Sequence, residues 1–253
     1  MSTTTTKGAP RGRIVQRISY AVGNLGQAAF YNALSTYFVT YYAAQTLFSH
    51  YGKSEAKALI GIITALVFIV RIAEIFLDPL LGNLIDNTNT RFGRFRPWQV
   101  IGGVVSSVLM FAIFTGLFGL VNVNKTVFIV VFIIVFILLD IFYSIRDISY
   151  WGMIPALSTE SHERGVFTAL GMFTGSVGYN GITVVVIPIV SFFSGLFASS
   201  SGQTQAGWTA FGAIIAVLGL LAIVLAVCSA TVWRPSATAK ATLAASPTQN
   251  YVV

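Results

Sequence analysis

Six long apolar runs, separated by short polar loops, make up most of this chain. A bilayer core is about 30 Å thick, so a helix that spans it needs about 20 mostly apolar residues. Every run meets that length. The pattern therefore predicts an all-α membrane protein whose six transmembrane helices form one bundle over residues 20–233, with spans near 20–48, 58–85, 98–121, 126–151, 167–194 and 208–233.

Both ends of the chain are polar. Residues 1–19 are basic and lack the short apolar core and cleavage site of a signal peptide, so we expect a cytoplasmic leader that is not cleaved. Residues 234–253 form a polar, low-complexity stretch typical of a disordered tail.

The first predicted helix is more polar than a lipid-facing surface should be. It carries Asn24, Gln27 and Asn32 among aromatic residues. Polar groups without partners are costly in hydrocarbon. We therefore expect this helix to line an interior cavity.

The second predicted helix carries Arg71, Glu74 and Asp78 in an otherwise apolar run. Each charge at the centre of a membrane helix costs about 2.5–3.5 kcal/mol, so all three must be paired, hydrated or bound to an ion. Because successive helical residues turn by about 100°, the spacing i, i+3, i+7 places them within about 60° of arc on one face. They form one site or line one path.

Two interpretations of the acidic pair are open. Carboxylate oxygens without His or Cys are hard ligands, suited to Na⁺, Li⁺ or a proton rather than to a transition metal. Pro79 would break the helix after Asp78 and free backbone carbonyls beside such an ion. The alternative is a structural salt bridge with Arg71.

The fourth predicted helix also carries charged residues in an otherwise apolar run. Asp140 and Asp147 lie seven residues apart on one face, with Tyr143 and Ser144 between them and Trp151 one turn further along. A carboxylate beside a flat aromatic ring suits a sugar, because hydroxyls donate to the carboxylate and the CH face of the sugar stacks on the indole.

A structural role is the alternative for each of these groups. Asp147 could pair with a basic side chain that holds two helices together, and Trp151 could be an interface anchor. Asp140 could pair with Arg71 or with Arg146, which points away from the face of the two aspartates. For Asp140 we favour the structural role.

Composition and charge agree with a multi-pass membrane protein. The chain is 55% hydrophobic and 9% charged, with a mean hydropathy of +0.79, whereas soluble domains carry about 25% charged residues. Cytoplasmic loops are rich in Lys and Arg. The termini and the loops on their side of the membrane carry ten basic residues, and the loops on the other side carry three, which places both termini in the cytoplasm. The net charge of +7 therefore reflects topology rather than nucleic-acid binding. The ten are Lys7, Arg11, Arg13, Arg17, Arg91, Arg94, Arg96, Arg164, Arg234 and Lys240.

Enzyme chemistry is not indicated. No metal-ligand spacing, nucleophile-and-base set or phosphate-binding loop appears, and His50 and His162 fall in loops on opposite sides of the membrane. The lone Cys228 excludes an internal disulfide. We expect no cofactor apart from a coupling cation.

Two stretches, RIAEIFLDPLLGNLIDNTNTRFGRFRPW and DIFYSIRDISYWGMIPALSTESHERG, carry a resemblance. The chain resembles the glycoside-pentoside-hexuronide:cation symporters of the major facilitator superfamily, especially their lactose and melibiose carriers. The likeness runs from about Arg17 to Trp233. It implies a sugar transporter of the cell membrane that is driven by Na⁺ or H⁺ symport.

The resemblance also implies roles for individual residues. Glu74 and Asp78 match the family's cation-coordinating acidic pair, and Asp147 and Trp151 match the residues that bind the galactosyl unit. Gln27 and Tyr31 on the first helix are further candidates for sugar contact. A charge network that controls gating would contain Arg71, Asp86, Arg91, Arg94, Asp140 and Arg146, with Gly82 and Gly93 in the same loop signature.

Three positions depart from the pattern of galactoside carriers. Ala28 replaces an aspartate, Gln27 replaces a lysine or asparagine, and Met172 replaces an arginine. The chain lacks these polar sugar contacts but retains the cation pair. The resemblance thus implies cation coupling, whereas the three departures all concern the sugar.

Family members resemble two six-helix halves with the substrate held between them, and this chain matches the amino-terminal half. We expect it to transport with a separate carboxy-terminal six-helix half as partner, besides the sugar and the lipid bilayer. The alternative is a truncated, non-transporting membrane protein or a regulatory partner of an intact carrier.

Overall fold

The computed structural model describes residues 11–49, 51–158, 160–199 and 202–232. The predicted tail at 234–253 and the first ten residues of the predicted leader lie outside them. The described elements are α1 (Arg11–Asn32), η1 (Ala33–Leu47), α2 (Lys53–Asp86), α3 (Arg96–Phe114), η2 (Leu120–Asn122), α4 (Lys125–Gly152), α5 (Ile154–Leu157), α6 (Ser161–Ala198) and α7 (Gln205–Val232).

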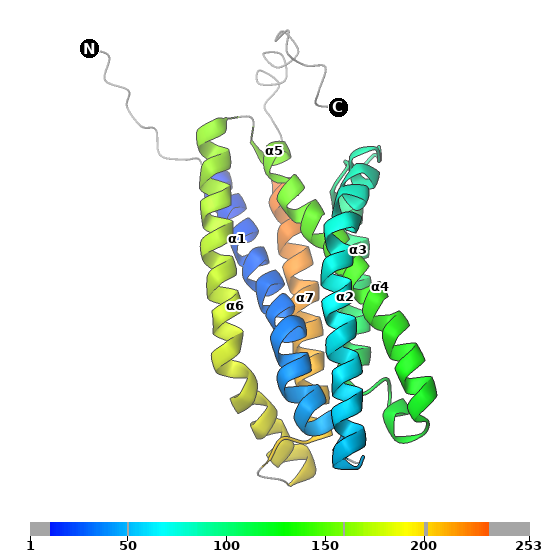
Figure 1. Cartoon of the computed structure of the whole chain (residues 1–253). Coiled ribbons are helices and arrows are strands. Elements are labelled where there is room, and N and C mark those ends of the chain that lie inside the picture. The colour runs from blue at the N-terminus through cyan, green and yellow to red at the C-terminus, as the bar shows by residue number, and fades with distance from the viewer. Residues whose placement is uncertain (1–10, 50, 159, 200–201, 233–253) are drawn as a thin grey trace, which may run out of the picture.

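The long helices form an elongated bundle (Figure 1). Helix α1 packs against α6 and α7, while α3 packs against α4 and α7, and α2 lies against α4 and η1. The start of α1, the α2–α3 loop, α5 and the described end of α7 gather at one end of the bundle, the upper end in Figure 1. We call it the basic end, because Arg91, Arg94 and Arg96 lie there.

The predicted all-α fold is confirmed. Among the described residues, five helices are long and apolar enough to cross a membrane, namely α2, α3, α4, α6 and α7. The remaining predicted span, near 20–48, corresponds to α1, which continues into the wider π-type turns of η1. Its polar residues keep it below the hydropathy of the other five.

Two boundaries and one expected break differ from the sequence prediction. Helix α1 begins at Arg11, so part of the predicted leader is helical. Helix α3 ends at Phe114 rather than 121, because Gly116 takes a φ of 63° and turns the chain out of the helix. Helix α2 runs unbroken through Pro79. The predicted break is wrong, since one missing N–H removes a single intrahelical hydrogen bond.

An aromatic core fills the half of the bundle away from the basic end. The ring of Phe38 stacks on Phe132 with centroids 5.4 Å apart, and Phe114 stacks on Trp208 at 5.9 Å. All four side chains are almost fully buried. Together with the edge-on contact of Phe38 with Phe114, these contacts join η1, α3, α4 and α7.

The polar residues of α1 mostly bind α6 rather than line a cavity. The Asn24 Nδ2 donates to the Gly171 carbonyl at 2.7 Å, and the Asn32 Nδ2 donates to the Tyr179 carbonyl at 2.5 Å. Helix α1 does line a cavity, as expected, but through Tyr31 rather than through Asn24 and Asn32. Where two helices approach closely, a buried side-chain amide on one can donate to a backbone carbonyl on the other.

That close approach depends on Gly178. A Cβ added at Gly178 would lie 2.1 Å from the backbone carbonyl oxygen of Leu25, so α1 and α6 would have to separate. We expect Gly178→Ala to lower the free energy of unfolding by about 2 kcal/mol through overpacking. Thermal unfolding of the purified chain in detergent measures it.

The matched control is Gly181→Ala on the same helix, because nothing lies within 4 Å of the Cβ that it adds. This variant should unfold within about 0.5 kcal/mol of the unaltered chain. Equal losses in the two variants would show that helix packing at Gly178 is not the cause.

Candidate functional site

A cavity of about 360 Å³ opens between three helices, α1, α2 and α4, midway along the bundle. Most of its lining is polar, and its lining residues are Tyr31, Arg71, Glu74, Asp78, Tyr143, Ser144, Asp147 and Ile148. The two helices with charged residues therefore present them to one space. The predicted site residues Tyr31, Arg71, Glu74, Asp78 and Asp147 are brought together there.

The cavity carries an excess of negative charge. Three carboxylates, Glu74, Asp78 and Asp147, line it against one guanidinium, Arg71. A fourth acidic group, Asp140, lies outside the lining and beside Arg71, with its side chain 4% exposed. Charges in a membrane interior need compensation, so this lining favours the entry of a cation.

Arg71 holds two of the carboxylates. Its Nη1 lies 2.7 Å from both oxygens of Glu74, one turn along α2, and 3.6 Å from Oδ1 of Asp140 on α4. The guanidinium also lies over the ring of Tyr31, 5.1 Å from its centroid. Of the two partners considered for Asp140, the structure places Arg71 beside it.

Asp78 differs from Glu74 in having no basic partner among the described residues. Its Oδ1 is buried and accepts no hydrogen bond from the described part of the chain. Glu74 and Asp78 are thus not both neutralised by basic side chains, and Asp78, which lines the cavity, keeps one unused acceptor oxygen. Within the described residues, no three side chains of His, Cys, Asp or Glu converge on one point as metal ligands.

Asp147 is held by the first helix. The Gln27 Nε2 donates to Asp147 Oδ1 at 2.5 Å across the α1–α4 contact. An ionised carboxylate has about four acceptor positions, so this bond leaves room for hydroxyl donors from the cavity. Gln27 itself does not line the cavity; it positions Asp147.

Trp151 is not among the cavity-lining residues. Its ring packs edge-on against Tyr150 at 5.4 Å and faces Gly171 of α6, toward the basic end. The side chain also interacts with Asp147, four residues earlier on α4. The predicted stacking platform therefore lies beside the cavity in this conformation rather than in its wall.

Three lining residues were not among the predicted site residues, namely Tyr143, Ser144 and Ile148. Tyr143 and Ser144 lie on the α4 face between Asp140 and Asp147, and both are largely buried. Their spacing of three and four residues from the aspartates is the signal that could have assigned them. The aromatic ring of Tyr143 stacks on Tyr31 with centroids 5.3 Å apart.

The remaining predicted network residues fall into two groups. At the basic end, Arg94 Nη1 lies 3.4 Å from Asp86 Oδ1, and Arg91 lies over the ring of Phe92. Arg146 is fully buried, 5.4 Å from the Phe30 ring centroid, and its guanidinium nitrogens find no acceptor in the described residues. The structure does not join Arg146 to the Arg71 network.

Comparison with known proteins decides the family. The model of the family described as "MFS/sugar transport protein" matches residues 19–251. The chain belongs to this family. The lengths and hydropathy of its helices are those of a multi-pass membrane protein.

Named relatives of this family transport sugars. The chain is 51% identical over 211 residues to a lactose permease of Leuconostoc lactis, covering 83% of this chain and 33% of that protein. It is 38% identical over 205 residues to a raffinose carrier protein of Pediococcus pentosaceus, covering 81% of this chain and 32% of that protein. The chain thus spans about a third of the length of these family members.

The ion-pair network of Arg71 supplies a prediction about stability. We expect Arg71→Gln to destabilise the chain by about 3 kcal/mol, because it leaves the buried Asp140 and the cavity-lining Glu74 without a compensating charge. Thermal unfolding in detergent checks this. The double variant Arg71→Gln/Asp140→Asn should recover part of the loss; no recovery would mean that Arg71 and Asp140 do not interact.

Proposed function

We propose that the chain forms the cation- and sugar-binding half of a sugar:cation symporter. The observation that carries the proposal is the cavity in which three carboxylates face one arginine, with an oxygen of Asp78 left without a partner. A site of this kind attracts a cation, and its polar wall offers acceptors to sugar hydroxyls.

In the proposed cycle, the coupling cation is cargo and binds at Asp78 and Glu74. Its positive charge competes with Arg71 for Glu74 and relieves the repulsion among the carboxylates. Both effects let α2 and α4 draw together around the cavity. Asp147 then accepts hydroxyl hydrogen bonds from the sugar, Gln27 fixes its orientation, and Tyr31 and Tyr143 flank the ligand.

For the substrate we propose a galactoside such as lactose or raffinose, on the strength of the two relatives described above. Retention of Asp147 supports this choice. The absence of an aspartate at Ala28 and of an arginine at Met172 implies fewer polar contacts than in other galactoside carriers. The coupling ion is Na⁺ or H⁺, since both suit carboxylate oxygens.

Transport by this chain is proposed to need a second six-helix half. Helix α2 has the least buried apolar window of the five spanning helices, 17%, and contributes three residues to a cavity that is open on one side. A facing half would cover this surface and enclose the cavity, and the two halves would rock to give alternating access. We place the protein in the cell membrane with the basic end in the cytoplasm.

Equilibrium binding tests the proposal. The purified chain would be titrated with radiolabelled lactose, raffinose and a non-galactoside sugar, each with and without Na⁺ and at several pH values. Affinity for a galactoside should rise at least tenfold with Na⁺ or with falling pH. Binding of no sugar under any condition, to a chain shown to be folded, contradicts the assignment to the symporter half.

A further inference from the structure

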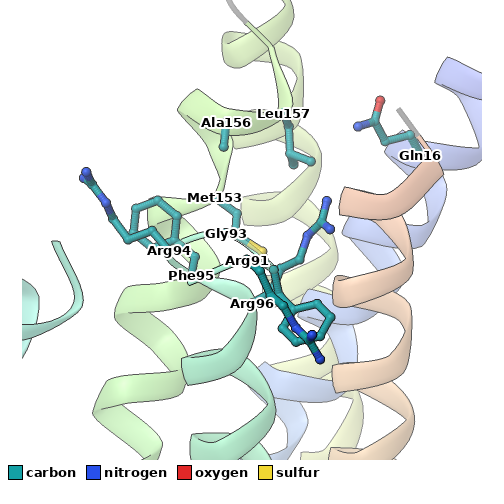
Figure 2. Close-up of a pocket in the computed structure, with 10 residues that line it drawn as sticks. Gln16, Arg91, Gly93, Arg94, Phe95, Arg96, Met153, Ala156 and Leu157 are labelled. Atoms are coloured by element: carbon teal, nitrogen blue, oxygen red, sulfur yellow. The ribbon is translucent and has the colours of Figure 1, made fainter. Parts of the chain in front are cut away.

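The basic end contains a second cavity, of about 380 Å³, that the proposed transport does not use. It lies between the start of α1, the α2–α3 loop and the α4–α5 junction (Figure 2). Its volume is within the range of small-ligand sites. We call it the arginine cavity, because Arg91, Arg94 and Arg96 are among its ten lining residues.

The lining carries positive charge and no carboxylate. Besides the three arginines, the walls consist of Gln16, Gly93 and five apolar or aromatic side chains, among them Met153 and Leu157. Asp86 lies outside the lining and is paired with the lining residue Arg94, at 3.4 Å. The cavity therefore has donors for an anion and no carboxylate in its wall.

Gln16 provides an independent sign of a ligand. The Gln16 residue is 2% exposed, and its Nε2 has no hydrogen-bond partner among the described residues. A buried amide donor without a partner is costly. Figure 2 shows Gln16 on the α1 side of the cavity, across from the arginine-bearing loop. The acid on the neighbouring α6, Glu163, is engaged by Arg17 at 2.5 Å and does not satisfy Gln16.

We propose that the arginine cavity binds a phosphate group, with the Gln16 amide and the Arg91 and Arg96 guanidinium groups as donors. Guanidinium groups suit phosphate because their planar N–H donors match its oxygens in pairs. Each has five N–H donors, so an arginine with an existing partner can still donate to an anion.

The phosphate can belong to an anionic lipid headgroup or to a soluble phosphate compound. The position of the cavity is compatible with a headgroup, because Trp98, at the start of α3, lies at the same end of the bundle and donates to Thr88 at 3.1 Å. Tryptophan is enriched at the membrane interface. The buried apolar wall at Met153 and Leu157 would contact the start of an acyl chain.

Native mass spectrometry of the detergent-solubilised full chain separates these sources. One arm titrates phosphatidylglycerol against phosphatidylcholine, and the other adds inorganic phosphate as competitor. We expect saturable binding of phosphatidylglycerol or of phosphate, weakened about 100-fold by Arg91→Gln/Arg96→Gln, since each lost charged hydrogen bond costs at least about tenfold. Displacement of the lipid by phosphate identifies a soluble ligand's site; retention of the lipid identifies a headgroup site.

The matched control is Lys53→Gln/Lys57→Gln, which removes two exposed charges at the opposite end of the bundle. It should bind like the unaltered chain. Gln16→Leu tests the buried donor, and Arg91→Lys should recover part of the affinity by restoring charge without the paired donors. Absence of saturable binding in both arms, or an equal loss in the lysine control, overturns the proposal. Neither outcome depends on whether the chain transports sugar.

Discussion

Asp78→Asn is expected to abolish cation-stimulated sugar uptake. Asp78 lines the central cavity and its buried Oδ1 has no partner among the described residues, so it is the carboxylate most available to a cation. An amide keeps the shape of the side chain but removes the charge. Losing one charged ligand costs about 3 kcal/mol, or about 100-fold in cation affinity.

Uptake of labelled lactose into proteoliposomes, with the chain and a second six-helix half, measures this effect with and without an ion gradient. Glu55→Gln is the matched control, because it removes one carboxylate from the same helix at an exposed position, 3.3 Å from Lys125. Stimulation should persist in this control. Unchanged coupling in Asp78→Asn would assign the cation to another site.

Asp147→Asn is expected to weaken galactoside binding about 100-fold while leaving cation binding largely intact. The carboxyl group accepts from Gln27 at 2.5 Å, and its remaining acceptor positions are available to the cavity that Asp147 lines. Two charged hydrogen bonds to sugar hydroxyls at about 1.5 kcal/mol each add up to roughly this factor. Equilibrium binding of labelled lactose to the purified chain provides the measurement.

Gln27→Leu distinguishes contact from positioning. If Gln27 only orients Asp147, its loss should lower sugar affinity by about fivefold to tenfold, within the range of one hydrogen bond. Glu160→Gln, which removes an exposed carboxylate near the start of α6, is the charge control and should leave affinity unchanged.

Equal affinity for lactose in Asp147→Asn and the unaltered chain would exclude Asp147 from the sugar site.

Much of this architecture could be predicted from residue patterns alone. Run length predicts the helices because a bilayer imposes a fixed span. The i, i+3, i+7 spacing places Arg71, Glu74 and Asp78 on one face, and they line one cavity in the structure. The spacing of Asp140 and Asp147 similarly indicates a charged face on α4, although only Asp147 reaches the cavity wall.

Interhelical partners could not be predicted in the same way. Asn24, Asn32 and Gln27 are alike in the sequence, yet the first two bind carbonyls of α6 and the third binds Asp147. Which neighbour each meets depends on how closely the helices approach, and Gly178 sets that distance for α6. A periodic pattern gives the face of a helix but not the helix that will cover it.

The place of Trp151 was missed for a related reason. Its position one turn after Asp147 puts both side chains on neighbouring parts of α4, but large rings reach along the helix toward the nearest space. Here that space lies against Gly171, where α6 has no side chain to exclude the indole. The arginine cavity also escaped prediction, because Gln16 and Arg91 are far apart in the chain and meet only in the folded bundle.

Cation binding to the purified chain, in the presence of a saturating galactoside, tests the role of the acidic cavity most directly. The experiment would follow ²²Na⁺ binding and proton uptake together over a range of pH. We predict saturable binding of Na⁺, or uptake of a proton, that Asp78→Asn eliminates and Glu55→Gln preserves. The same cation or proton binding in Asp78→Asn as in the unaltered chain would contradict a coupling site at the carboxylates of α2.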